Sequence, residues 1–325
     1  MYDDWSIGDV GLVHTLGIVC KVCVAMFVFL SGYALGITNT IVTTQDIKDF
    51  YIRRFTKLFL NYWFIWILFV PIGIWLFRRS FSNVYPEPTF VYTLLDFLGL
   101  INLTGEYGYN PTWWFYSCII LLYLVFPLIA LTIRKWPWSI WVIVIGSIIL
   151  IKIPSVFINP VRFYLFPFLF GIILANGIIT KKIPPSIFYS LASCFSGTLK
   201  IFGLIVILLL FITAVLIRLT ISYALLWDSC VALIIVLLYK NINWNYRLHD
   251  GMEFLGRHSF NIFLFHTFIY YLYFPFLIYW SRNPLIIFLS LLLSSIVISI
   301  GIEQMKKYIG FNNIQYFIQN KYNSK

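Results

Sequence analysis

The chain has 325 residues, of which 61% are hydrophobic and only 11% are charged. A soluble domain carries about a quarter charged residues, so this composition excludes an ordinary soluble protein. The net charge of +11 would suggest a nucleic-acid partner for a soluble protein. Most of the Lys and Arg, however, lie in short loops beside apolar segments, where they set membrane topology and contact anionic headgroups. We therefore expect the lipid bilayer, and no nucleic acid, as a partner.

Nine apolar segments of the chain are each long enough to cross a bilayer. They lie at about residues 16–38, 58–77, 113–133, 138–156, 161–179, 201–217, 221–239, 259–280 and 284–302. Because lipid offers the backbone no hydrogen-bond partners, and the runs are continuous rather than alternating, each span is predicted to be an α-helix. The sequence therefore predicts an all-α, polytopic transmembrane helical bundle. We expect a single domain over residues 1–325, with a cytoplasmic tail over 304–325.

The basic residues are divided unequally between the two sides of this bundle. Sixteen of the 23 Lys and Arg lie on one face, and six lie on the opposite face. The positive-inside rule makes the richer face cytoplasmic, which places the C-terminus inside the cell. An odd number of spans then puts the N-terminus outside, although the first residues carry no export signal. We therefore expect a further helix upstream of Met1.

The densest basic cluster lies at the cytoplasmic entrance of the second predicted span. Arg53, Arg54 and Lys57 fall within about one helical turn, and Lys57 shares a helix face with one of the two arginines. Two interpretations stay open. The cluster can be a topology anchor whose side chains reach the headgroups. It can also be a socket for the phosphates of a cytoplasmic nucleotide-bearing donor, because Arg offers phosphate two parallel donors and Lys a point charge.

Ionisable residues inside apolar spans are costly and commonly face a cavity. His266 lies in the eighth predicted span, close to Ser259 and Asn261. It can act in catalysis or serve as a hydrogen-bond partner between helices. The five cysteines are scattered and do not complete a ligand set, so we predict no metal site. No phosphate-binding glycine loop or other motif of soluble enzymes is present.

Two motifs occur in the first part of the chain. Residues 24–33 (VAMFVFLSGY) are similar to an apolar helix that ends in Phe-Phe-x-x-Ser-Gly-Tyr. Ser31 and Gly32 of this segment can also be small residues that allow close helix contact. Residues 53–57 (RRFTK) are similar to an Arg-Arg-x-x-Arg motif, with Lys57 in place of the last Arg.

Two further motifs follow. Residues 114–127 keep a Trp, a Tyr and a Pro at the spacing Trp114, Tyr123 and Pro127, and residues 255–266 are similar to Gly-x-x-Ser-x-x-Ile-Tyr-Leu-x-His. Taken in order, the four motifs resemble the acyltransferase 3 family of integral membrane acyltransferases. Each motif alone is weak, and the specificity comes from finding all four in sequence.

The resemblance implies an enzyme that transfers an acyl group, commonly acetyl, from acyl-CoA to a hydroxyl of a glycan or a lipid-linked saccharide. It also implies the bacterial cytoplasmic membrane, with acyl-CoA as a substrate and no permanently bound cofactor. The family has ten spans, and its first span carries Arg or Lys, ten residues, and then a catalytic His. We expect this His upstream of Met1, and an impaired chain without it. Arg247 and His258 have the same spacing, but they lie in a predicted loop and we interpret the match as coincidence.

The resemblance also assigns roles to single residues. Arg53, Arg54 and Lys57 would bind the CoA phosphates. The candidates for an acyl passage or for acceptor binding are Ser31, Trp114, Tyr123, Arg162, Ser259 and, as a weak catalytic candidate, His266. Arg162 precedes a Phe-Pro-Phe-x-x-x-Gly helix of the family pattern, where it can hold an anionic group or mark the outer interface.

Two other functions stay open. A secondary transporter or glycan translocator also uses about ten helices with few charges in the membrane. Such transporters commonly have two related halves with broken helices, which this sequence does not display. A non-catalytic remnant of the acyltransferase family is the second alternative.

Overall fold

The computed structural model describes residues 6–7, 10–38, 41–153, 159–179, 225–241 and 246–323, together with residues 209, 212, 213, 216 and 217. Helices dominate this part of the chain, beside one short antiparallel ribbon of β1 (Ser6–Ile7) and β2 (Val10–Gly11). The helices are α1 (Leu12–Cys20), α2 (Val22–Thr38), α3 (Thr44–Phe77), α4 (Phe81–Val84), α5 (Thr89–Phe97), η1 (Ile101–Leu103), η2 (Pro111–Trp113), α6 (Trp114–Lys135), α7 (Ser139–Lys152), α8 (Asn159–Arg162), α9 (Leu165–Ile179), α12 (Leu225–Asn241), α13 (Tyr246–Thr267), η3 (Phe268–Tyr273), α14 (Pro275–Ile278), α15 (Pro284–Tyr308) and α16 (Phe311–Asn323). The predicted helical class is confirmed.

Four helical stretches of the described residues are long and apolar enough to cross a membrane: Val13–Thr38, Thr44–Phe77, Pro111–Lys135 and Pro284–Tyr308. They correspond to the first, second, third and ninth predicted spans. The apolar helices α7 and α9 occupy the fourth and fifth predicted spans but are shorter. The sixth predicted span, 201–217, falls almost entirely outside the described residues. The multi-pass architecture is thus confirmed, whereas the count of nine spans is not.

The eighth predicted span has different boundaries in the structure. Helix α13 begins at Tyr246, so the predicted loop is wrong for residues 246–258. The apolar second half of α13 runs on into the π-helix η3 and then α14. The reason for the error is physical, since hydropathy reports apolar content and the first half of α13 is polar but still helical. His258 therefore lies on a helix.

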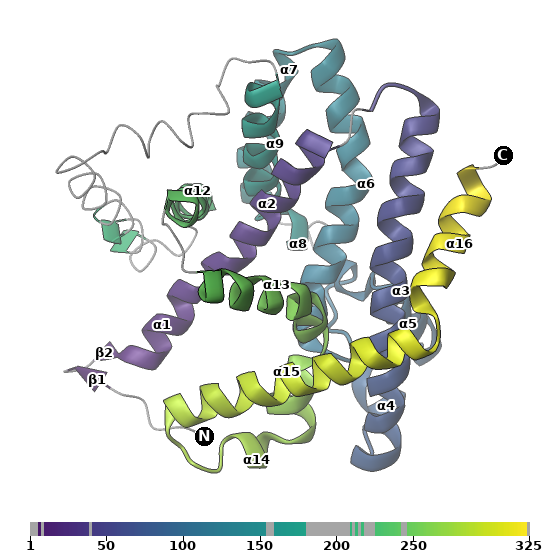
Figure 1. Ribbon diagram of the computed structural model, residues 1–325, viewed down its shortest axis with the longest axis vertical. Coiled ribbons are helices and arrows are strands. Elements are labelled where there is room, and N and C mark those ends of the chain that lie inside the picture. The colour runs from purple at the N-terminus through teal and green to yellow at the C-terminus, as the bar shows by residue number, and fades with distance from the viewer. Residues whose placement is uncertain are drawn as a thin grey trace.

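The long helices are arranged in one packed group, and α3, α6, α7 and α9 stand side by side along the long axis (Figure 1). Helix α2 crosses α9 obliquely, and α15 runs across the lower part of the view. After α15 the chain turns at Gly310, which has a positive φ of 67°, and α16 packs back against α3. The predicted tail over 304–325 thus contains the end of α15 and an ordered helix that contacts the bundle.

Small residues allow α2 and α9 to approach closely. A Cβ atom at Gly32 would collide with the backbone oxygen of Phe168, and one at Gly171 would collide with the backbone oxygen of Phe29. Helix pairs in membranes commonly pack through such small residues, because lipid provides no hydrophobic driving force between helices. The interpretation of Gly32 as a close-contact residue is confirmed.

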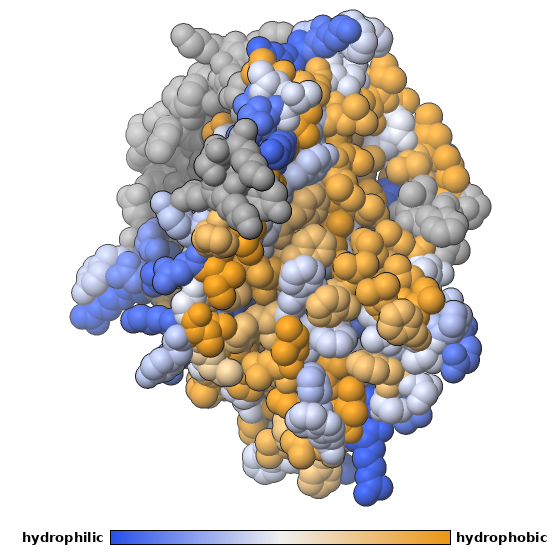
Figure 2. All heavy atoms as spheres, turned by 90° about the vertical axis from the view of Figure 1, so that its right-hand side faces the viewer, coloured by the Kyte–Doolittle hydropathy of each residue, from blue (hydrophilic) through white to orange (hydrophobic). Residues whose placement is uncertain are grey.

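The outer surface is strongly apolar. Figure 2 shows a broad hydrophobic area across one face, with hydrophilic side chains gathered mainly at its margins. The exposed side chains include Ile67, Trp75 and Leu76 on α3 and Leu293 and Val297 on α15. A soluble protein rarely exposes so much contiguous apolar surface, whereas a protein in lipid must do so.

The segment between α3 and α6 folds back onto the bundle around Asp96. This carboxyl group is fully buried, and its Oδ2 accepts hydrogen bonds from the Tyr85 hydroxyl at 2.6 Å and the Tyr109 N–H at 3.2 Å. The Tyr62 hydroxyl of α3 donates to the Asp96 carbonyl oxygen at 2.6 Å. Burial raises the pKa of Asp96 to about 6, although the Tyr85 and Tyr109 hydrogen bonds act in the opposite direction. We call Asp96, Tyr85 and Tyr109 the Asp96 cluster.

Candidate functional site

The predicted basic cluster lies in the first half of α3, whose start is fixed by a capping box. The Thr43 hydroxyl accepts from the Asp46 N–H at 3.1 Å, and the Asp46 carboxylate accepts from the Thr43 N–H at 2.7 Å. Such reciprocal bonds satisfy the free N–H groups at a helix start. The helix therefore runs without interruption through Arg54 and Lys57 and presents both on one face.

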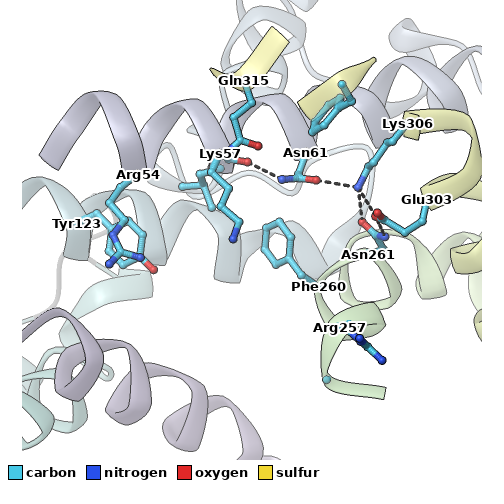
Figure 3. A pocket seen from close by; sticks show the side chains of 13 residues that line it. Arg54, Lys57, Asn61, Tyr123, Arg257, Phe260, Asn261, Glu303, Lys306 and Gln315 are labelled. Atoms are coloured by element: carbon cyan, nitrogen blue, oxygen red, sulfur yellow. Dashed lines mark hydrogen bonds and ion pairs between the residues drawn. The ribbon is translucent and has the colours of Figure 1, made fainter. Parts of the chain in front are cut away.

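Arg54 and Lys57 line a cavity of about 630 Å³, which we call the basic pocket. Its wall is formed by α3, α6, α13, α15 and α16, and Figure 3 shows the side chains of Arg54 and Lys57 beside it. The lining residues are Arg54, Lys57, Leu58, Asn61, Tyr123, Gly256, Arg257, Phe260, Asn261, Glu303, Lys306, Phe311 and Gln315. The cavity is large enough for part of a nucleotide-sized ligand, because small-molecule sites measure roughly 300–1,000 Å³.

The three residues of the predicted basic cluster do not share one environment. Arg53 is exposed and is not among the lining residues of the basic pocket, and its Nε donates to the Asp49 carbonyl oxygen of its own helix at 3.2 Å. Arg54 is half-buried, and its Nη2 lies 3.5 Å from the Thr38 hydroxyl. Lys57 is exposed to the pocket. Arg54 and Lys57 are therefore the members of the cluster that can meet a ligand there.

Other helices supply further charges to the same pocket. Arg257 of α13 lines it with a side chain that is 68% exposed and lies 3.8 Å from Glu253. Lys306 of α15 is only 5% exposed. Its ammonium group lies 2.8 Å from the carboxylate of Glu303, which also lines the pocket. Four cationic side chains and one carboxylate therefore face this cavity.

The Lys306 ammonium group is fully hydrogen bonded. Its Nζ donates to Asn61 Oδ1 at 2.7 Å, to Asn261 Oδ1 at 2.8 Å and to Glu303 Oε1 at 2.8 Å. Asn261 Nδ2 in turn donates to Glu303 Oε1 at 2.6 Å. The rings of Phe64 and Phe311 lie 5.8 and 5.4 Å from the same nitrogen, within the range of a cation–π contact. We call Lys306, Glu303, Asn61 and Asn261 the Lys306 cluster.

His258 extends this cluster along α13. Its Nδ1 lies 2.8 Å from the Ser299 hydroxyl, and Ser299 also accepts a weak hydrogen bond from Asn261 Nδ2 at 3.4 Å. Sequence reasoning assigned no role to His258, because it placed this residue in a loop. It also missed Lys306 and Glu303, which follow the last predicted span. The available signal was two opposite charges three residues apart at the end of a long apolar helix.

Two of the passage candidates meet in the structure. Tyr123 of α6 lines the basic pocket, and its side chain interacts with that of Ser31 on α2. The Ser259 hydroxyl instead donates to the Gly256 carbonyl oxygen of its own helix at 2.7 Å. Ser31 therefore lies behind the pocket wall at Tyr123, whereas Ser259 is half-buried on α13 and does not line the pocket.

The remaining candidates lie away from the pocket lining. His266 Nδ1 is 2.9 and 3.0 Å from the carbonyl oxygens of Ile262 and Phe263. Carbonyl oxygens can only accept, so Nδ1 carries the proton and the Nε2 of the neutral ring keeps a lone pair. Trp114 packs on Tyr164 at 5.5 Å between ring centroids. Arg162 donates to the Ile153 carbonyl oxygen at 2.9 Å.

Three side chains of α13 have ligand atoms close enough together to hold a metal ion. His249, Asp250 and Glu253 place them within 4.8 Å of one another. All three residues are exposed, and exposed acidic groups commonly lie this close without an ion. We assign no metal to them.

The fold and the pocket define a multi-pass membrane protein with a basic cavity among its helices. A family model described as an acyltransferase domain matches residues 1–304, most of the chain. The protein belongs to this family, acyltransferase 3, as its four motifs predicted, and membership supports a membrane acyltransferase. No curated protein and no solved structure matches the chain.

Proposed function

We propose that this protein transfers an acyl group, with acetyl the first to test, from acyl-CoA to a hydroxyl of a cell-surface glycan or its precursor. The observation that carries the proposal is the basic pocket, where Arg54 and Lys57 of a family motif are joined by Arg257. Guanidinium and ammonium groups are the donors that bind phosphate in proteins, and CoA carries phosphates. The proposal places the protein in a bacterial cytoplasmic membrane, with the basic pocket on the cytoplasmic side.

The transfer replaces the carbon–sulfur bond of the thioester with a carbon–oxygen bond, and the proton of the acceptor hydroxyl ends on the released CoA. A base removes the proton of the acceptor hydroxyl, and its oxygen attacks the thioester carbonyl carbon. The carbon–sulfur bond then breaks, and CoA leaves as a thiolate that takes up a proton. A neutral imidazole suits the base, because its ordinary pKa lies near physiological pH. Among the described residues His266 is our candidate, since its Nε2 keeps a lone pair.

The thioester needs a path from the phosphates toward the acceptor. Tyr123 lines the basic pocket and interacts with Ser31 on the next helix. We propose that the acyl chain leaves the pocket at this side, so that the phosphates stay at Arg54 and Lys57. The path would bring the thioester toward α2 and α9.

The test compares charge-removing variants of α3. We expect Arg54→Gln and Lys57→Gln each to raise the KM for acetyl-CoA about tenfold or more, because hydrogen bonds to charged groups contribute roughly 1.5–3 kcal/mol. Lys48→Gln is the matched control, since Lys48 lies on the same helix, is exposed and does not line the pocket. The measurement is CoA release by the full chain in lipid nanodiscs with a glycan acceptor. A glycan translocator would release no CoA, and an unchanged KM in both variants would contradict the assigned donor site.

A further inference from the structure

The Glu303–Lys306 pair stands between two cavities. Both residues line the basic pocket, and both also line a second cavity of about 520 Å³. His258 and Lys307 line the second cavity only. The pair is therefore a shared wall, and its charge acts on any ligand on either side.

Lys306 has no hydrogen-bond donor left for a ligand. An ammonium group has three N–H donors, and the acceptors on Asn61, Asn261 and Glu303 lie at 2.7, 2.8 and 2.8 Å. A phosphate could be bound by this nitrogen only if one of these three bonds were broken. Within the basic pocket, Arg54, Lys57 and Arg257 are the cations without such a saturated set.

Glu303 is a carboxylate in a pocket proposed to bind phosphates. On its own it would repel such a ligand, because like charges at this range disfavour one another. Lys306 offsets that charge at 2.8 Å. Asn261 fixes the arrangement, since its Oδ1 accepts from Lys306 while its Nδ2 donates to Glu303.

The pair is also connected to the turn of α3 that carries Lys57. Asn61 accepts from Lys306 through Oδ1, and its Nδ2 donates to the Lys57 carbonyl oxygen at 2.7 Å. Figure 3 shows this row of hydrogen bonds running from the Lys57 backbone through the side chains of Asn61 and Lys306, with Glu303 and Asn261 at its end. Hydrogen bonds therefore connect Lys306, through Asn61, to the backbone of a proposed phosphate ligand.

We infer that Glu303 and Lys306 form a charge-compensated wall that sets the affinity of the basic pocket for the donor's phosphates without contacting them. Glu303 lowers this affinity, Lys306 offsets that effect, and Lys306 acts as a positioning residue rather than as a phosphate ligand. The inference rests on the proposed donor site. It adds to that site two residues that determine how strongly anions are attracted.

The experiment measures binding of CoA and, separately, of inorganic pyrophosphate to the purified full chain in detergent by isothermal titration calorimetry. The variants are Glu303→Gln, Lys306→Gln and the double variant, with Lys307→Gln as the control. We expect Glu303→Gln to bind CoA about threefold to tenfold more tightly and Lys306→Gln to bind it more weakly by a similar factor, because each variant removes one charge beside the pocket and the interaction lies between the limits of bulk water and a protein surface. The double variant should return to within about twofold of the wild type.

The double variant decides between the two roles of Lys306. If Lys306 contacts phosphate directly, Lys306→Gln loses more affinity than Glu303→Gln gains, so the double variant binds CoA clearly more weakly than the wild type, and the inference is overturned. Unchanged CoA affinity in Glu303→Gln overturns it as well. This second test needs no Lys306 variant, so it holds even if Lys306→Gln does not fold. We expect Glu303→Gln to fold, because its amide oxygen still accepts from Lys306 and Asn261.

Binding of CoA and of pyrophosphate, compared with acyl transfer, distinguishes a failure of this inference from a failure of the proposed function. The variant pattern with pyrophosphate, but no acyl transfer by the wild type, supports the wall and contradicts the acyltransferase proposal. Acyl transfer and CoA binding without the variant pattern contradict the wall alone. A wild type that binds neither anion contradicts both.

Discussion

The Lys306 cluster and the Asp96 cluster each bury one ionisable side chain, but only the Lys306 cluster pairs it with an opposite charge. Lys306 is 5% exposed, its three donors all have acceptors, and one of those acceptors is a carboxylate. Asp96 is fully buried, its Oδ2 accepts hydrogen bonds from the Tyr85 hydroxyl and the Tyr109 N–H, and the Trp66 side chain also favours the ionised form of its carboxyl group. The charge is compensated in the first cluster and is not compensated by a cation in the second.

The difference shows what each cluster can do. The Lys306 cluster lines two cavities, so its charges can act on a ligand. The Asp96 cluster lines neither of these cavities and connects the segment after α3 to the bundle through Tyr62, Tyr85 and Tyr109. A buried carboxyl group without a cation is favoured in its protonated form. We therefore assign the first cluster to ligand binding and the second to holding the segment in place.

The largest effect is expected from removing the Lys306 charge. Lys306→Met leaves Glu303 without its cation and leaves Asn61 and Asn261 without a donor. Breaking a buried ion pair costs about 3–5 kcal/mol, and the exposure of Glu303 reduces this by solvent screening, so we expect about 2–3 kcal/mol. The free energy of unfolding can be measured by chemical unfolding in mixed micelles. Lys307 is the exposed neighbour, and Lys307→Met should change the free energy of unfolding by less than about 0.5 kcal/mol. Equal losses in the two variants would contradict a special stabilising role for the Lys306 charge.

The second effect is a pH dependence at Asp96. Its folded pKa of about 6 lies above the ordinary value of 3.8. The group therefore contributes stability that is fully present below about pH 4 and is lost as the pH rises through about 6. The expected loss is on the order of 2–3 kcal/mol. Asp96→Asn cannot ionise, so its stability should exceed that of the wild type increasingly between pH 4 and pH 7.

Thermal unfolding of both proteins across this pH range makes the comparison. Curves that stay parallel from pH 4 to pH 7 would show that Asp96 does not titrate there in the folded protein. Lys306→Met should instead be less stable than the wild type at every pH from 4.5 to 7, because its loss comes from the removed cation and the acceptors left without a donor. This contrast separates the two clusters.

Local spacing was sufficient to predict part of the pocket. Arg54 and Lys57 are three residues apart on one helix, so their shared face followed from helix geometry alone. Long apolar runs were also sufficient for α3, α6 and α15, because hydrophobic length is the main signal for a span. The close contact at Gly32 followed from the small side chain.

The rest of the pocket depends on packing between distant segments. Lys306 and Asn61 are 245 residues apart, and no local pattern links them. The polar first half of α13 is invisible to hydropathy, which is why His258 was placed in a loop. The burial of Asp96 could not be predicted from local sequence, because tyrosines from the segment itself and from α3 produce it.

The smallest effect is expected from the hydroxyl that Tyr85 donates to Asp96 at 2.6 Å. Tyr85→Phe removes this hydrogen bond, and we expect a loss of about 1–2 kcal/mol at pH 7.5, where Asp96 is ionised. The loss should be smaller at pH 4.5, where Asp96 is protonated and needs the donor less. Thermal unfolding at the two pH values measures it, with Tyr107→Phe as control, because Tyr107 is 73% exposed in the same segment.

The same variant also tests the division of roles between the clusters. Tyr85 does not line the basic pocket, so Tyr85→Phe should bind CoA with unchanged affinity even where it loses stability. A weaker CoA affinity would mean that the Asp96 cluster acts on the donor site through α3, since Tyr62 follows Asn61 directly on that helix. The two clusters would then be parts of one coupled site, because loss of the Tyr85 hydrogen bond to Asp96 would change, through Tyr62 and the adjacent Asn61, how Lys306 is held beside the basic pocket.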